Sequence, residues 1–359
     1  MATSATPSAP RLTPAASRRR RPLPIFTWAF VSLALLLVYN LLFARSFFLV
    51  HMENGRLVGN IINVLHYGSF VMLLSLGMTL VIATGGIDLS VGAIMAIAGG
   101  VSAILVTNKD VLTGQAIAGH SAALALAAGL AAGIIAGLWN GVLIGLVDIP
   151  PIIATLILMI SGRGVAIWIT RGQVPTIASA SFLSLAQGVV WGIPNTILIT
   201  LAVAALAIVL VRASALGLFI ESIGNNASAS TIAGINTRLV KIMAYGFTGF
   251  CAGLAGMMDA ALNKAGDTSQ SGMDIELDAI VAVAIGGTSL VGGRFSLIGS
   301  LVGALTMQTL KVTIQSSNIK PEFNFIVEAA VVVIICLLQS PRTRVLIQRF
   351  FRHTAKERP

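Results

Sequence analysis

The stretch Gly77-Met-Thr-Leu-Val-Ile-Ala-Thr-Gly-Gly-Ile-Asp-Leu-Ser-Val-Gly92 sets two glycines and one carboxylate between two apolar runs. A glycine pair interrupts a helix and leaves backbone groups that need hydrogen-bond partners. In a bilayer, such a break is tolerated only where it is buried in protein or lines a wet cavity. The stretch therefore predicts one membrane helix that ends near Ala83 and a second that begins near Leu89.

The whole chain has the composition of a membrane protein. Of its 359 residues, 56% are hydrophobic and 10% are charged, and the mean hydropathy is +0.92, whereas soluble domains carry about 25% charged residues. The apolar runs are continuous and do not alternate, which argues against a β-barrel. We expect an all-α polytopic membrane protein with broken, glycine-rich helices and about ten spans, at residues 25–44, 60–83, 89–107, 121–146, 152–170, 195–211, 239–262, 278–290, 296–314 and 323–340.

Basic residues are concentrated at the two ends of the chain and in alternate loops. Residues 1–24 end in four arginines, residues 341–359 are also basic, and both are predicted to be cytoplasmic tails of a membrane domain at 25–340. The net charge of +10 is thus explained by membrane orientation and not by a nucleic-acid-binding face. A cleaved signal peptide is the alternative for the first span, but 25–44 is long for that role and lacks a cleavage site. This orientation also places four loop residues inside: Arg212, Arg238, Lys241 and Arg294.

A second stretch, Ile280-Val-Ala-Val-Ala-Ile-Gly-Gly-Thr-Ser-Leu-Val-Gly-Gly293, aligns without gaps with residues 79–92. Internal repeats are common in transporters, and chance similarity of glycine-rich apolar segments is the alternative. With the spans above, the two copies are predicted to run in the same direction. The candidates for the translocation pathway or the broken helices are Gly85, Gly86, Asp88, Ser90, Asn140, Gly286 and Gly287.

Four polar residues inside or between the predicted spans need an explanation. Asp88 either faces a polar path or caps the helix that follows it, and the sequence favours the cap. Asn140 either meets a sugar hydroxyl or makes an interhelical hydrogen bond. Arg163 implies a partner carboxylate or an aqueous face, and Asp259 is predicted to face protein or water.

The segment 212–238 is the longest predicted cytoplasmic loop. Asn226 can cap a short helix of small residues, and Gly234 can end it in the left-handed conformation with Ile235 packed behind. Such a helix suits docking in the groove of a partner, and an ordinary surface turn is the alternative. The candidate residues for coupling to an ATPase are Glu221, Gly224, Asn226, Ala229 and Gly234.

The sequence gives no support for an enzyme or a metal site. No GxxxxGK[ST] phosphate loop and no nucleophile–base constellation occur, so ATP, if used, is hydrolysed by a partner. Neither a metal nor another cofactor is expected in this chain. Two cysteines lie in apolar windows and the four histidines are scattered, at Cys251, Cys336, His51, His66, His120 and His353.

Four motifs together carry a resemblance to a known family. Besides residues 77–92, they are Ala154-Thr-Leu-Ile-Leu-Met159 with Arg163-Gly164, Leu216-Gly217 through Gly224 to Gly234-Ile235-Asn236, and Leu277-Asp278-Ala279-Ile280 through Gly286-Gly287 to Gly292-Gly293-Arg294. On these, the chain resembles the permease subunits of ribose- and galactofuranose-type ABC importers over roughly residues 60 to 340. Phe219-Ile220-Glu221 and Gly293-Arg294-Phe295 are more similar to the galactofuranose type.

The resemblance implies a permease in a bacterial inner membrane that moves a simple sugar, such as galactofuranose or ribose, into the cytoplasm. It implies three partners: an ATPase with two nucleotide-binding domains, a second permease subunit that is identical or a sister, and a periplasmic sugar-binding protein. The sugar itself stays open, because the binding protein supplies most of the selectivity. Asp88 and Asp259 keep an ion-coupled secondary transporter as the alternative, while a membrane-embedded enzyme and a passive channel have less support.

Overall fold

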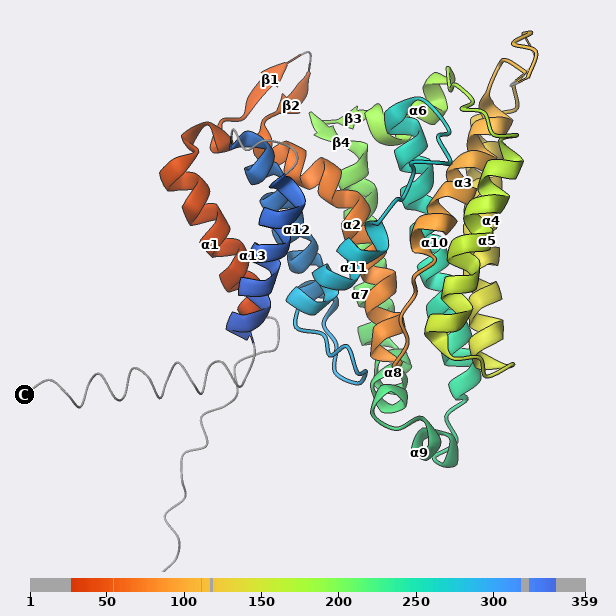
Figure 1. Ribbon diagram of the computed structural model, residues 1–359, viewed down its shortest axis with the longest axis vertical. Coiled ribbons are helices and arrows are strands. Elements are labelled where there is room, and N and C mark those ends of the chain that lie inside the picture. Colours follow the sequence, from red (N-terminus) through yellow and green to blue (C-terminus); the bar gives the residue numbers. More distant parts are fainter. Residues whose placement is uncertain (1–26, 54, 111, 117–118, 318–322, 340–359) are drawn as a thin grey trace, which may run out of the picture.

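The computed structural model describes residues 27–53, 55–110, 112–116, 119–317 and 323–339. The helices run side by side between two ends of the molecule (Figure 1). One end, here called the hairpin end, carries the antiparallel pairs β1–β2 (His51–Glu53 and Arg56–Val58) and β3–β4 (Val189–Val190 and Ile193–Pro194). The opposite end, here called the α9 end, carries α8 (Leu216–Asn225) and α9 (Ala227–Ile232).

Six helices in the described part of the chain are long and apolar enough to cross a membrane. They are α2 (Asn60–Ala83), α4 (Ala122–Gly145), α5 (Pro151–Ile169), α7 (Asn195–Ala213), α10 (Thr237–Asn263) and α12 (Leu297–Ser316). The other helices are shorter: α1 (Thr27–Phe43), the 3₁₀-helix η1 (Arg45–Phe48), α3 (Val91–Val106), α6 (Ala180–Gln187), α11 (Ile275–Ile285) and α13 (Asn324–Gln339).

These elements confirm an all-α polytopic membrane protein and correct two details. Each expected span contains a helix, but α11 ends at Ile285, where residue 290 was predicted, because Gly287 takes a left-handed φ of +84° just after it. With 11 residues and a rise of about 1.5 Å per residue, α11 covers only half of the roughly 30 Å hydrocarbon core. The eighth of the expected spans, at 278–290, therefore forms a helix that is too short to cross the hydrocarbon core by itself. The two short hairpins were not predicted.

Local sequence explains where the long helices begin and end. The Ser121 side chain accepts a hydrogen bond from Leu124 N (3.3 Å) at the start of α4, and α5 begins at Pro151, whose fixed φ suits a first helical position. Asn236 caps α10 in the same way through Leu239 N (3.1 Å). At its other end α10 stops at Lys264, which takes the left-handed conformation.

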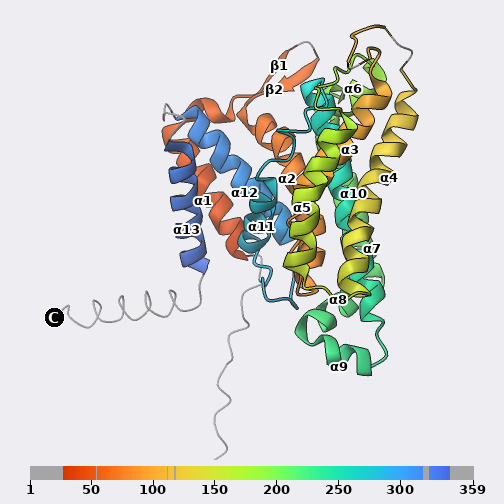
Figure 2. The ribbon, with the colours of Figure 1, turned by 45° about the vertical axis from the view of Figure 1, so that its right-hand side comes forward.

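The core forms where α10 packs against α2, α3 and α4 in the middle of the bundle (Figure 2). Glycines make this approach close: a Cβ on Gly137 would lie 2.4 Å from Tyr245 O, and one on Gly249 would lie 2.3 Å from Gly133 O. Small residues at helix interfaces are the usual means of close packing in a membrane, where burial of apolar surface drives little association. The α4–α10 contact is thus specified by glycine spacing.

The direction of the chain agrees with an even number of crossings. The first turn of α1 and the last turn of α13 both point toward the α9 end (Figure 1). The turn between α2 and α3 and the turn between α11 and α12 also lie there, so the two copies of the repeat run in the same direction, as predicted. The predicted tails, residues 1–24 and 341–359, lie outside the described residues.

Candidate functional site

The first glycine pair ends α2 and turns the chain back into the bundle. Gly85 takes a left-handed φ of +85°, and residues 84–90 lead from α2 to α3 with α3 beginning at Val91. Gly86 is required for another reason, since a Cβ there would lie 2.4 Å from the Tyr245 hydroxyl. The sequence prediction of a broken helix at this position is confirmed.

The second glycine pair ends α11 and leads to α12. A Cβ on Gly286 would lie 2.5 Å from Ser300 N, so α12 packs directly on this backbone. After the turn, Ser296 caps α12 by accepting a hydrogen bond from Gly299 N (3.0 Å). Both repeat copies thus contain a glycine break at the α9 end, followed by a helix that returns toward the hairpin end.

The two breaks and helix α8 meet in one contact, which we call the glycine joint and define by Ala83, Gly85, Gly224, Gly292 and Gly293. Gly293 N donates a hydrogen bond to Ala83 O (3.0 Å). A Cβ on Gly292 would lie 3.1 Å from Gly85 N, and one on Gly224 would lie 1.9 Å from Ala83 O and 2.2 Å from Gly293 N. The joint brings Gly85, which was predicted for the pathway, together with Gly224, which was predicted for coupling.

Asp88 lies in the middle of the first break and is fully buried. Its Oδ1 accepts hydrogen bonds from the Ser90 backbone N–H (2.9 Å) and hydroxyl (2.6 Å), and the Asn140 amide of α4 donates to Ser90 Oγ (2.8 Å). The residue in the N-cap position of α3 is Ser90, and the helix begins two residues later than predicted. Asp88 therefore fixes the turn before the helix, which corrects the prediction that it caps a helix starting at Leu89.

Three buried polar atoms around this turn have no hydrogen-bond partner among the described residues: Asp88 Oδ2, Asn140 Oδ1 and the Tyr245 hydroxyl. All three belong to residues that are fully buried. The sequence did not single out Tyr245, because one tyrosine in an apolar helix gives no signal of what it faces. Asn140 makes the interhelical hydrogen bond that was one of its two predicted roles.

The loop at 212–238 folds as two helices whose local geometry agrees with the prediction. The Asn226 side chain accepts from Ala229 N (2.9 Å), Gly234 takes a φ of +87°, and Ile235 N donates to Ser230 O (3.0 Å) to close α9. Ser222 Oγ and Ser230 Oγ lie 2.8 Å apart and tie α8 to α9. The docking role of this segment stays a prediction.

The exposed surface of α9 includes one large apolar side chain that the sequence reading missed. Ile232, the last residue of α9, is 89% exposed, and Ala229 is exposed on the same short helix. Glu221 is elsewhere: it lines a recess of about 520 Å³ between α7, α8 and the start of α12, together with Arg212, Gly217 and Phe295. Of the five predicted coupling residues, Asn226, Ala229 and Gly234 belong to the α9 unit, while Gly224 belongs to the joint.

Arg163 and Asp259 are bonded by the segment 264–274 that connects α10 to α11. The Arg163 guanidinium donates to the carbonyl oxygens of Thr268 (3.0 Å) and Ser271 (2.5 Å). Of the two predicted environments of Arg163, a partner carboxylate or an aqueous face, the direct carboxylate partner is replaced by backbone carbonyls, and acidic residues lie close by. Asp259 accepts from Ser271 Oγ (2.6 Å), which confirms that it faces protein.

Comparison with known proteins assigns the family. Residues 60–336 match the family described as branched-chain amino acid transport system / permease component. The chain is 43% identical over 318 residues to the galactofuranose transporter permease protein YtfT of Escherichia coli (strain K12), covering 89% of this chain and 90% of that protein. It is 36% identical to the fructose import permease protein FruF of Bifidobacterium longum (strain NCC 2705), covering 88% of each.

A third relative is the ribose import permease protein RbsC of Escherichia coli (strain K12), which is 33% identical over 79% of this chain and 87% of that protein. No solved structure matches the chain. The matched region contains both glycine breaks, the α8–α9 segment and Arg163. The resemblance read from the motifs is confirmed, and the chain belongs to this family of permease components of ABC importers.

Proposed function

We propose that this chain is the membrane-spanning permease subunit of an ATP-driven importer that moves a monosaccharide into the cytoplasm. The observation that carries the proposal is its 43% identity over 89% of the chain to a galactofuranose transporter permease. Fructose and ribose permeases are similar over most of their length too, so the substrate class is a simple sugar and its identity is left to experiment.

The glycine joint is the contact through which movement of an ATP-driven partner would reach the permease. A partner that moves α8 and α9 would displace Gly224, which lies on the backbone of Ala83 and Gly293. Those two residues belong to the two breaks that precede α3 and α12. The proposed partners are an ATPase with two nucleotide-binding domains at the α9 end, a second permease subunit, and a periplasmic sugar-binding protein at the hairpin end.

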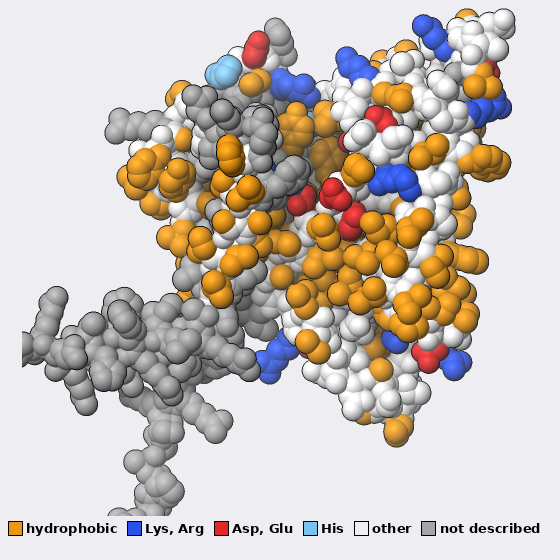
Figure 3. All heavy atoms as spheres, in the orientation of Figure 1, with side chains coloured by type: hydrophobic (Ala, Val, Ile, Leu, Met, Phe, Trp, Pro, Cys, Tyr) orange, Lys and Arg blue, Asp and Glu red, His pale blue; other side chains and the backbone are white. Residues whose placement is uncertain are grey.

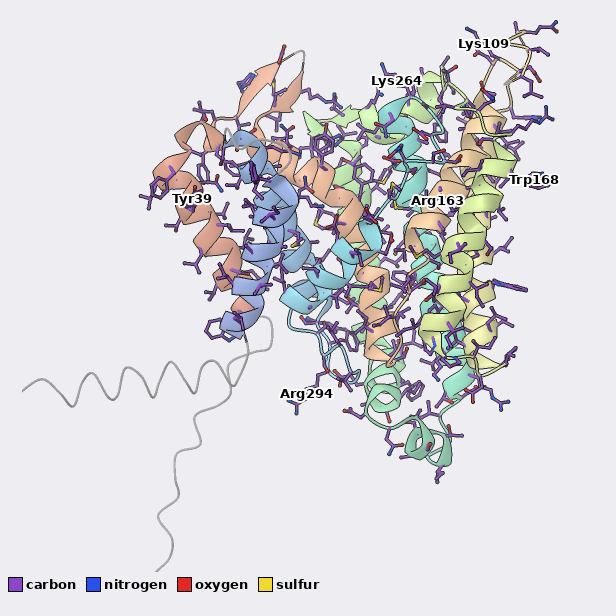
Figure 4. All side chains as sticks on the ribbon, viewed as in Figure 1. Tyr39, Lys109, Arg163, Trp168, Lys264 and Arg294 are labelled. Carbon is purple, nitrogen blue, oxygen red and sulfur yellow. The ribbon has the colours of Figure 1, made fainter. Side chains whose placement is uncertain are left out.

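The proposed orientation places the α9 end in the cytoplasm of a bacterial cell. The described basic residues are divided almost evenly: Arg212, Arg238, Lys241 and Arg294 belong to the α9 end, and Arg45, Arg56, Lys109, Arg171 and Lys264 belong to the hairpin end. Figure 4 shows Arg294 at the first end and Lys109 and Lys264 at the other. The positive-inside rule supports this choice through the basic sequences of the two tails, residues 1–24 and 341–359, because the helices that they adjoin begin and end toward the α9 end.

The experiment is uptake into vesicles that hold the purified chain with its ATPase and binding protein. Labelled galactofuranose, fructose and ribose are offered separately, with ATP, with a non-hydrolysable ATP analogue, and with an imposed proton or sodium gradient. Uptake of one of these sugars that requires ATP hydrolysis and the binding protein is expected. Uptake driven by an ion gradient with the ATPase omitted would establish the alternative, a secondary transporter.

A further inference from the structure

The recess that contains Glu221 lies at the α9 end and is lined by three helices. Its volume is about 520 Å³, which falls in the range of about 300–1,000 Å³ typical of small-molecule sites. The end of α7, the first half of α8 and the start of α12 line it together. We call it the α7–α8 recess and define it by five of its lining residues: Ile208, Arg212, Leu218, Glu221 and Phe295.

The α7–α8 recess holds one cation and one carboxylate that do not pair with each other. Arg212 supplies the guanidinium and Glu221 supplies the carboxylate. Among the described residues, neither side chain takes part in an ion pair or a hydrogen bond. Both signs of charge are therefore available to a single ligand.

The recess lies at the depth where lipid headgroups begin. Helix α7 has 19 residues, and at a rise of about 1.5 Å per residue it is about as long as the hydrocarbon core is thick, roughly 30 Å. Arg212 is the last residue but one of this helix, so its guanidinium lies at the boundary of that core. On the face drawn in Figure 3, apolar side chains cover the part of the bundle nearest the α9 end, and basic and acidic side chains appear below them.

An apolar stripe on α7 leads from the middle of the membrane to the recess. At intervals of four, three and four residues, three apolar residues share one face of the helix with Arg212: Leu201, Ala205 and Ile208. Leu201 is 56% exposed and Ala205 is exposed too. On α8, Leu218 adds an apolar side chain that is 69% exposed. A lipid tail can therefore lie along α7 while its headgroup enters the recess.

We propose that the α7–α8 recess binds the headgroup of a phospholipid that carries both a phosphate and a primary ammonium, as phosphatidylethanolamine does. The Arg212 guanidinium donates hydrogen bonds to the phosphate oxygens. The ammonium of the lipid donates to the carboxylate of Glu221. The inference goes beyond the proposed function, because it concerns neither sugar nor ATP.

The two charges select this headgroup among common phospholipids. The anionic headgroup of phosphatidylglycerol is attracted by Arg212 but repelled by Glu221. The headgroup of phosphatidylcholine carries both charges, but its quaternary ammonium has no N–H to donate to a carboxylate. A surface of the ATPase is the other candidate for a recess at this end, and the exposed apolar stripe on α7 favours lipid, because that stripe lies within the hydrocarbon core.

A bound headgroup connects α7 to α8 close to the glycine joint. It joins Arg212 at the end of α7 to Glu221, which lies three residues before Gly224 on α8. Gly224 in turn contacts the backbone of both glycine breaks. The lipid is therefore expected to stabilise the position of α8 and to raise the thermal stability of the purified chain.

The test is native mass spectrometry of the full-length chain in detergent. Phosphatidylethanolamine, phosphatidylcholine and phosphatidylglycerol with identical acyl chains are titrated separately. The wild type is expected to bind phosphatidylethanolamine about fivefold more tightly than either other lipid, and Arg212→Gln is expected to lose about fivefold in affinity for it. Glu221→Gln is expected to reverse the preference toward phosphatidylglycerol, because an unopposed cation remains. A misfolded variant would not gain affinity for one lipid in this way.

The matched control is Arg171→Gln, which removes an exposed arginine at the hairpin end and is expected to leave the order of affinities unchanged. Equal affinities of the wild type for the three lipids would overturn the proposal, since they describe a non-selective lipid coat. Tightest binding of phosphatidylglycerol to the wild type would also overturn it. An unchanged order in both Arg212→Gln and Glu221→Gln would place the lipid elsewhere and have the same consequence.

The same titration on the complete importer distinguishes lipid from protein as the occupant. Selective binding of phosphatidylethanolamine is expected to persist when the ATPase is attached. Its loss on assembly would assign the recess to the ATPase and overturn the proposal. Because the titration uses neither sugar nor ATP, its failure is distinct from a failure of the uptake experiment that tests the proposed function.

Discussion

Gly224 shows how much one residue can determine in this molecule. A methyl group there would meet Ala83 O at 1.9 Å and Gly293 N at 2.2 Å, and both are backbone atoms that no rotamer change can move aside. The contact of α8 with both glycine breaks therefore requires glycine at position 224, where no side chain fits. The sequence marked Gly224 as part of a motif, but it gave no indication of its neighbours, which lie far away along the chain.

Gly224→Ala is expected to lower the stability of the purified chain and to reduce ATP-driven uptake at least tenfold. The matched control is Gly164→Ala on α5, where a Cβ meets nothing within 4 Å and the change is expected to be neutral or to stabilise by up to about 1 kcal/mol. Thermal unfolding in detergent and uptake in vesicles are the measurements. Equal thermal stability and equal uptake of the two variants would show that the backbone of the joint moves aside to accept a methyl group, which would contradict the prediction.

Asp88→Asn is expected to be tolerated far better than Asp88→Leu. Asn keeps an acceptor for the Ser90 N–H and hydroxyl, whereas Leu leaves these buried donors unpaired, at about 1–3 kcal/mol each. Thermal stability and folded yield measure the difference. Equal losses in both variants would mean that the charge of Asp88, and not its hydrogen bonds to Ser90, is what the site requires.

At the scale of the element, local signals were read correctly and long-range ones were not. The Asn226 cap and the Gly234 stop of α9 depend on residues within one turn of the helix, so the sequence predicted both. The partners of Arg163 are backbone carbonyls more than 100 positions away, and no sequence pattern marks them. The end of α11 at Ile285 was missed because the span was extended across Gly286 and Gly287 to include Leu290, where the chain has already left the helix.

The α9 helix offers a direct test of coupling. Ala229→Trp adds bulk on its exposed surface, and Ile232→Ser removes the side chain that is 89% exposed. Both are expected to leave the membrane domain folded and to lower assembly with the ATPase and stimulated hydrolysis severalfold. Gly234→Trp is a poorer probe, because a φ of +87° strains any residue other than glycine.

Leu112→Trp is the control for added bulk, since Leu112 is 60% exposed on the α3–α4 connection at the hairpin end. It is expected to assemble with the ATPase as the wild type does. Full retention of assembly, hydrolysis and uptake by Ala229→Trp and Ile232→Ser would reject α9 as the coupling element.

At the scale of the whole molecule, composition and apolar run length predicted the class of fold and nearly all helix positions. They did so because a bilayer imposes one length and one backbone solution on every span. They did not predict which helices pack together, since α4 and α10 are matched through glycines that only the folded chain places face to face. The glycine joint, which is built from segments far apart in the sequence, could not be predicted either.

The orientation of the molecule is tested with single cysteines in a background from which Cys251 and Cys336 have been replaced by alanine. Ser228→Cys on α9 is expected to resist a membrane-impermeant thiol reagent in intact cells, while Ser269→Cys in the α10–α11 connection is expected to react. Both side chains are exposed, so burial does not explain a difference. The reverse labelling pattern would invert the proposed topology. Cysteines near Ser17 and Thr354 extend the test to the tails.

The contact between Gly224, Ala83 and Gly293 joins backbone to backbone. Such a contact cannot adjust by a change of side-chain rotamer. Side chains that meet across an interface can change rotamer and absorb a small displacement before anything beyond them moves. Here a push on α8 of a few tenths of an ångström has nothing to absorb it. If the α9 end receives the movement of a partner, as proposed, a short displacement there reaches both glycine breaks, and the same close contact makes the joint intolerant of substitution.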